Sequence, residues 1–218
     1  MRYEEDTVSE DIYKRLAKHL AALGMGYPEK EELLEILREN FTPHEAEVAL
    51  AIPTNVIPFE PVPVEEIASH MKIPKKELES ILSNLAHRAL LFSKKMKRGK
   101  TGYALQQFGY GFPQTFFWKG VDTPNGKKLA ELIFKYSRTE QLVEVYGRTE
   151  TKAFRYIPAS PSLEPEQHAV FPFEMMEEVI QRVKVIALVH CPCRTTAHLT
   201  GKKRCDHPLE NCIKYDEL

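Results

Sequence analysis

Apolar residues recur every three or four positions along the first part of the chain, and this spacing predicts amphipathic helices. The predicted helices cover residues 11–24, 29–40 and 42–52. The third has the strongest start signal, because Thr42 can cap it, Pro43 occupies its first position and Glu45 completes a capping box. The proline-rich stretch over residues 53–63 predicts a loop after it.

The next stretch changes from a helical to a strand pattern. It predicts helices over 64–71 and 75–88, and strands over 90–96 and 103–108 joined by a turn. Helix, turn, helix and a two-stranded hairpin follow one another in this order in winged helix–turn–helix domains. A helical hairpin beside an unrelated β-hairpin is the alternative interpretation.

The second half of the chain alternates between helix and strand patterns. It predicts a helix over 124–146, a strand over 149–157, a loop over 158–167, a helix over 172–183 and a strand over 185–190. The last strand is continuously apolar, so we expect it to be buried on both faces in a small α/β unit, with a ligand beyond its carboxyl end.

These patterns predict an α+β fold in three parts. Residues 1–28 form an N-terminal helical arm and residues 29–118 a winged helix-like domain. Residues 119–218 form a small α/β domain that ends in a four-cysteine cluster loop.

Composition narrows the protein class. The chain has 218 residues, 43% of them hydrophobic, and its 30 basic and 31 acidic residues nearly cancel, so it is not a disordered chain. It contains no apolar run of about 18 residues and its acidic start is not a secretory signal, so we expect no membrane association. These features predict a cytoplasmic protein with reduced thiols.

The four cysteines lie close together near the end of the chain. Cys191, Cys193, Cys205 and Cys212 have the spacing C-x-C-x11-C-x6-C. A disulfide scaffold does not suit the cytosol, so four thiols point to structural zinc or to an iron–sulfur cluster. Zinc usually uses C-x2–4-C pairs, whereas one residue, Pro192, separates the first two cysteines here. The uneven spacing favours a 4Fe–4S cluster, with zinc and unrelated buried or reactive thiols as alternatives.

The residues around the cysteines resemble those of a family of 4Fe–4S ferredoxin-type proteins from anaerobic bacteria and archaea, in which an apolar strand runs into C-x-C-R and a C-D-x-P-L-E-x-C segment follows. The matching residues are Cys191, Cys193, Arg194, Cys205, Asp206, Pro208, Leu209, Glu210 and Cys212. The resemblance extends to residues 155–158 and 170–174 and to the N-terminal winged helix-like domain. It implies a 4Fe–4S cluster on the four cysteines and electron transfer with a redox partner protein. Many members continue into a ferredoxin-like module, whereas six residues follow Cys212 here.

Several polar residues flank the cysteines. Arg194, His198 and His207 are candidates for contact with the ligands, and either histidine could replace a cysteine as ligand or simply face solvent. Arg194 and residues 202–204 place positive charge near an anionic cluster, which favours its reduced form. An ordinary solvated basic turn is the alternative for residues 202–204.

The predicted winged helix suggests DNA as a further partner. Residues 75–100 contain eight basic and two acidic residues. The candidate nucleic-acid contacts are Asn84, Arg88, Lys94, Lys95, Lys97, Arg98 and Lys100. Glu77 and Glu79 on the predicted recognition helix would repel phosphate, and winged helices also serve as protein docking modules. A solvated hairpin is the alternative.

Residues 108–118 contain six aromatic residues without interleaved basic ones, which favours a hydrophobic seam between domains or in a homodimer over base stacking. The chain lacks a glycine-rich phosphate loop, an H-E-x-x-H pattern and a G-x-S-x-G pattern, so an autonomous enzyme is the least favoured class. The leading hypothesis is an iron–sulfur electron-transfer protein. An iron–sulfur winged-helix regulator that senses redox state or oxygen is the first alternative, and a zinc-stabilised docking protein is the second.

Overall fold

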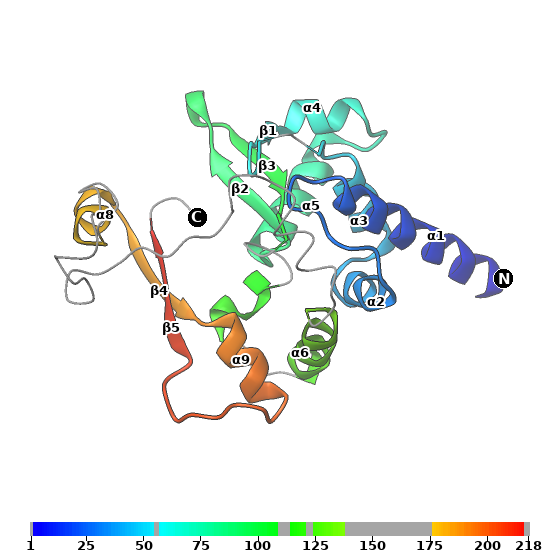
Figure 1. Ribbon diagram of the computed structural model, residues 1–218. Coiled ribbons are helices and arrows are strands. Elements are labelled where there is room, and N and C mark those ends of the chain that lie inside the picture. The colour runs from blue at the N-terminus through cyan, green and yellow to red at the C-terminus, as the bar shows by residue number, and fades with distance from the viewer. Residues whose placement is uncertain (1, 55–56, 109–113, 121–123, 138–175, 216–218) are drawn as a thin grey trace.

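The computed structural model describes residues 2–54, 57–108, 114–120, 124–137 and 176–215. Within these residues the fold is mixed α+β, as predicted, with a helical body around a three-stranded sheet and a separate two-stranded sheet (Figure 1). The strand and loop predicted over 149–167 lie outside the described residues, as do the segments 155–158 and 170–174. Every helix in the described part of the chain is too short or too polar to cross a bilayer.

The first three helices follow the predicted periodicity. They are α1 (Arg2–Ala21), α2 (Glu31–Asn40) and α3 (Pro43–Leu50). The predicted capping box of α3 is present, because Glu45 N donates to Thr42 Oγ1 at 3.2 Å and Thr42 N donates to Glu45 Oε2 at 2.8 Å. Such a cap contributes about 1 kcal/mol. Helix α1 begins at Arg2, earlier than predicted, because no glycine or proline interrupts residues 2–21.

The central stretch contains the elements predicted for it. They are α4 (Val64–Ser69), α5 (Lys75–His87), β2 (Leu91–Lys95), the 3-10 turn η1 (Lys97–Gly99) and β3 (Thr101–Leu105). A short strand that was not predicted, β1 (Val62–Pro63), makes the sheet order β1-β3-β2, antiparallel throughout. Helix α5 buries Leu78, Leu82 and Leu85, which recur on one face at helical spacing.

One buried cluster runs from α1 to α6 (Pro124–Tyr136). Leu129, Ile133 and Tyr136 of α6 are buried, and α6 packs on α2. The Tyr136 hydroxyl donates to the Pro28 carbonyl at 2.8 Å. The core therefore crosses the boundaries predicted after residues 28 and 118, and within the described residues these boundaries do not separate cores. The predicted boundaries do not separate cores because the apolar faces of α1 and α6 both pack into the same hydrophobic core.

The described part of the aromatic segment belongs to this core. Phe108 contacts the rings of Tyr27 and Tyr136 edge-on, with centroid distances of 5.4 and 5.5 Å. Phe117 lies in the 3-10 helix η2 (Gln114–Lys119) and is 1% exposed. Residues 109–113 lie outside the described residues. Phe108 and Phe117 therefore pack within this chain, and burying such rings contributes about 1.5–3 kcal/mol each.

The last part of the chain differs from its prediction. Its elements are α8 (Met176–Arg182), β4 (Ile186–His190), α9 (Pro192–Leu199) and β5 (Glu210–Tyr215). Strand β4 lies where predicted, but burial on both faces is wrong, because Leu188 is 66% exposed. Among the described residues β4 pairs with β5 in an antiparallel two-stranded sheet, on which Ile186, Leu188 and Ile213 are exposed. Both β5 and α9 were missed.

Candidate metal centre

The residue after β4 is fixed from two sides. Cys191 N donates to the Leu209 carbonyl at 2.7 Å, which ties it to the segment leading into β5. The Cys191 carbonyl accepts from Thr195 N at 2.9 Å, so Cys191 also forms the N-cap of α9. Pro192 occupies the first position of that helix, where its fixed φ is favourable. Cys191 therefore sits at a strand-to-helix junction with a defined backbone.

Helix α9 carries the second cysteine in its first turn and ends in a defined way. Gly201 has φ of 68°, Lys202 N donates to the Ala197 carbonyl at 2.7 Å, and Gly201 N donates to the His198 carbonyl at 3.0 Å. These bonds form a Schellman motif, in which glycine adopts the left-handed conformation. A proline at the first helical position and a glycine nine positions later are sequence signals from which α9 could have been predicted.

Three of the four thiols interact with one another. Strand β5 pairs Cys212 with Val189, two residues before Cys191. The Cys191 thiol lies close enough to the thiols of Cys193 and Cys212 to influence how readily each of them ionises. Loss of hydration beside the surrounding protein, followed by the interaction with Cys191, raises the pKa of Cys212 to about 11 and also raises the pKa of Cys193, although Cys193 remains exposed. Without a metal both thiols hold their protons at neutral pH, so a metal must displace protons to bind.

The fourth cysteine reaches this group through an arginine. Cys205 is exposed on the loop between α9 and β5. Arg194 Nη1 donates to the Cys205 sulfur at 3.3 Å. With the carboxamide oxygen of Asn211 turned toward Arg194, that oxygen accepts from Nε and Nη2, each at 3.1 Å. Arg194 thus joins the loop bearing Cys205 to the strand bearing Cys212.

The donor chemistry suits a thiophilic metal or cluster, because the four thiols come from one strand-to-helix junction, one loop and one strand, and Arg194 contacts both the loop and the strand. In the described part of the chain, no three Cys, His, Asp or Glu side chains form a group arranged to hold a single ion.

Two lysines near the cysteines lie against aromatic rings. The Lys202 ammonium lies 3.5 Å from the centroid of the Phe134 ring on α6, so it contacts the helical body. The Lys214 ammonium lies 4.4 Å from the Trp118 centroid and interacts with Cys212. Burial lowers the pKa of Lys214, and the nearby Cys212 opposes that shift. Sequence reasoning missed Lys214, although a strand places residues 212 and 214 on the same face.

The histidines fall into two groups. His198 on α9 and His207 on the following loop are both exposed. His190, at the end of β4, was not predicted as a site residue. Its Nε2 lies 3.2 Å from Glu210 Oε1, and its ring lies directly against Gly120. His190 therefore anchors the end of β4 against the segment after η2.

The candidate DNA contacts at the end of α5 are engaged in hydrogen bonds within the chain, although Asn84 remains exposed. Arg88 Nη1 donates to Glu45 Oε1 at 2.6 Å and to Asn84 Oδ1 at 3.1 Å, and Nη2 donates to the Asn40 carbonyl. The Arg88 side chain is 37% exposed and Glu45 only 15%. Arg88 and Asn84 thus connect α5 to the junction of α2 and α3.

The candidate contacts on the hairpin are partly neutralised. Glu65 Oε1 accepts from Lys75 Nζ at 2.9 Å and from Lys100 Nζ at 3.1 Å. Lys95 Nζ donates to Thr101 Oγ1 at 3.1 Å. Lys94 and Lys97 are exposed, and the side chain of Arg98 lies outside the described part of the structure. These pairings reduce the positive charge available to phosphate.

Comparison of the chain with family models, with curated proteins and with solved structures gives no significant match.

Proposed function

We propose that this protein binds a 4Fe–4S cluster through Cys191, Cys193, Cys205 and Cys212 and transfers electrons to or from a partner protein. The observation that carries the proposal is the electrostatic interaction of the Cys191, Cys193 and Cys212 thiols with one another, together with the hydrogen bond from Arg194 to the Cys205 sulfur. When bound, such a cluster takes up and releases single electrons. The chain supplies the thiolates, a guanidinium that offsets their negative charge, and a backbone that holds three of them on paired strands and a helix start.

Exposure of the site supports the electron-transfer part of the proposal. Cys193 and Cys205 are exposed, so a partner can approach the cluster closely. We propose further that α4, α5, β2 and β3 form a winged helix that docks a protein rather than DNA. The internal pairing of Arg88 with Glu45, and of Lys75 and Lys100 with Glu65, favours docking of a protein over DNA.

Metal analysis of the full-length chain, purified and kept without oxygen, tests the proposal. We expect a brown protein with about four irons and four sulfides per chain. Electron paramagnetic resonance should show that the cluster is reduced reversibly by one electron. A colourless protein with one tightly bound zinc ion would replace the cluster with the structural-zinc alternative. Four alkylatable thiols with neither metal would reject both.

A further inference from the structure

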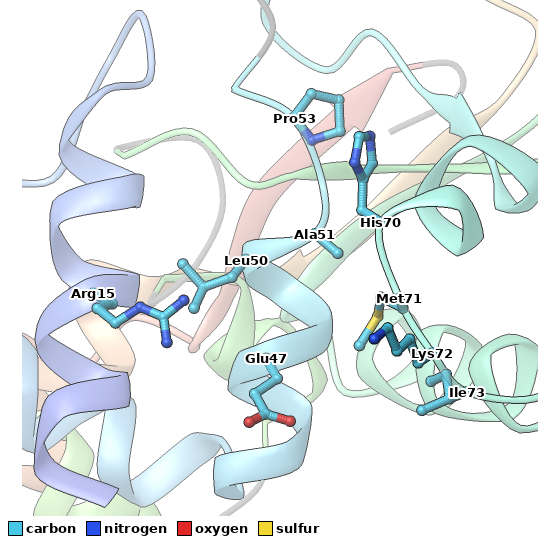
Figure 2. A pocket seen from close by; sticks show the side chains of 9 residues that line it. All are labelled: Arg15, Glu47, Leu50, Ala51, Pro53, His70, Met71, Lys72 and Ile73. Carbon is cyan, nitrogen blue, oxygen red and sulfur yellow. The ribbon is translucent and has the colours of Figure 1, made fainter. Parts of the chain in front are cut away.

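An open groove lies between α1, the end of α3 and the turn that joins α4 to α5 (Figure 2). Its volume is about 670 Å³. The residues that line it are Arg15, Glu47, Leu50, Ala51, Pro53, His70, Met71, Lys72 and Ile73. None of these nine residues is buried. The groove therefore differs from small-molecule pockets, which enclose most of the ligand surface.

The floor of the groove is apolar and firmly supported. Leu50, Ala51, Met71 and Ile73 are partly buried and pack against the core. Burying such surface yields about 25 cal/mol per Å² of apolar area, so the floor favours an apolar side chain from a partner. Met71 adds adaptability, because an unbranched thioether adjusts to different shapes.

The charges of the groove are mainly positive. Arg15 projects from α1 and Lys72 from the turn, and neither makes an ion pair with another described side chain (Figure 2). Elsewhere in the same body, lysines pair with carboxylates, as Lys75 and Lys100 do with Glu65. The acid of the groove, Glu47, lies 3.5 Å from His44. Within the described residues, neither cation of the groove forms an ion pair of the kind that Lys75 and Lys100 form with Glu65.

We propose that this groove binds a short segment of a partner protein in which apolar side chains are flanked by carboxylates. The apolar side chains would lie on Leu50, Met71 and Ile73, while Arg15 and Lys72 would pair with the carboxylates. Charge complementarity favours an acidic segment, and the open apolar floor favours a protein over a small anion. This site is separate from the cysteines and does not depend on the proposed cluster.

Peptide display tests this proposal with the full-length chain. A library of random 12-residue peptides is selected on the wild-type protein and counter-selected on the double variant Arg15→Glu/Lys72→Glu. We expect enriched peptides that combine Asp or Glu with Leu, Ile, Phe or Met. A synthetic copy of an enriched peptide should bind wild type in fluorescence anisotropy and lose about tenfold or more in affinity to the double variant, with further weakening at high salt.

Three controls keep the test decisive. Lys97→Glu changes an exposed lysine on the hairpin and should leave peptide affinity unchanged. If the charge reversal disturbs the fold, the neutral double variant Arg15→Gln/Lys72→Gln replaces it. Helicity and melting temperature are measured for both double variants. Met71→Lys should also weaken binding, because it places a charge on the floor. Enriched peptides that lack acidic residues, or that bind the charge variants as well as wild type, would overturn the proposal. Decanoate, a small amphiphile, is tested as a second probe. Binding of decanoate with no binding of any peptide would also overturn the proposal.

Discussion

The Arg194 guanidinium lies between two segments that carry cysteines, and its Nη1 donates a hydrogen bond of 3.3 Å to the Cys205 sulfur. The same side chain reaches the carboxamide oxygen of Asn211, the neighbour of Cys212. A planar guanidinium with several donors can hold both contacts at once, whereas a lysine ammonium has no such fork. Arg194 therefore acts as a positioning residue for the cysteine site.

Replacing Arg194 by Gln should weaken metal retention and make the cluster harder to reduce. We expect a loss of about 10- to 100-fold in retention, the range typical for residues that orient metal ligands. The reduction potential should fall, because a positive charge beside an anionic cluster favours its reduced form. Chelator challenge and redox titration measure these two effects.

The matched variant Arg194→Lys separates charge from geometry. Arg194→Lys should restore most of the reduction potential, because it keeps the positive charge. It should not restore metal retention, because an ammonium lacks the paired donors of the guanidinium. Equal values for both variants and wild type in both measurements would show that Arg194 has no role at the site.

Replacing Cys193 by Ser should abolish the cluster while the helical body stays folded. The buried hydrophobic core from Ile12 to Tyr136 contains no cysteine, and of the cysteine-bearing helix α9 Leu199 packs against it, so we expect the free energy of unfolding of this core to change little. Iron content and circular dichroism at 222 nm check the two parts of this prediction. His198→Ala is the control and should keep the cluster. Cooperative unfolding of the helical body in Cys193→Ser would contradict the prediction.

Gly120→Ala should destabilise the contact between η2 and β4. Gly120 has φ of 67°, and an added Cβ would lie 2.3 Å from the His190 ring. Gly99 has a similar φ of 73° with no atom near its missing Cβ, so Gly99→Ala measures the backbone strain alone. We expect about 1 kcal/mol for Gly99→Ala and about 1–3 kcal/mol more for Gly120→Ala in urea unfolding. Equal losses would mean that His190 moves aside without cost.

The fold of the first half was largely predictable, because local signals determine it. The helical periodicity of apolar residues and the capping residues predicted α2, α3 and α5, and the strand patterns predicted β2 and β3. The environment of β4 was not predictable in the same way. A continuous apolar run suits both a buried parallel strand and an exposed antiparallel one, and only the non-local pairing with β5 decides.

In the candidate site, too, local features were predictable from the sequence and tertiary contacts were not. The cysteines were evident from their spacing, whereas the contacts of Arg194 with Cys205 and of Lys214 with Cys212 depend on the path of the loop between α9 and β5. The inward turn of Arg88 depends likewise on Glu45, far away in the sequence. Such tertiary pairings leave no local pattern.

Glu65 should titrate far below other glutamates. The hydrogen bond from Lys75, then backbone and Lys100 hydrogen bonds, lower the pKa of Glu65 from 4.5 to about 2. A lowered pKa contributes stability above about pH 4.5, and this contribution is lost as the pH falls through about 2. Carbon-detected NMR titration of the side chain measures the value. Lys75→Met should raise the pKa toward 4.5 and Lys97→Met should not; an unperturbed Glu65 in wild type would contradict the pairing.

DNA binding by this protein should be weak and independent of sequence. Arg88 is engaged by Glu45 and Asn84, and Glu65 neutralises Lys75 and Lys100, so few of the candidate contacts remain for phosphate. We expect dissociation constants of about 10⁻⁴–10⁻⁶ M, typical of non-specific binding, in anisotropy measurements with a labelled duplex.

The salt dependence of that binding identifies the surface involved. Each lost phosphate contact changes the slope of log K against log salt by about 0.9, so Lys95→Gln/Lys97→Gln should flatten the slope by about two units if the hairpin carries the contacts. Lys127→Gln/Lys135→Gln removes the same charge from α6 and should leave the slope unchanged. Tight, sequence-specific binding that disappears on cluster loss would instead favour a regulator, because only a difference in affinity between the two states can couple the cluster to DNA.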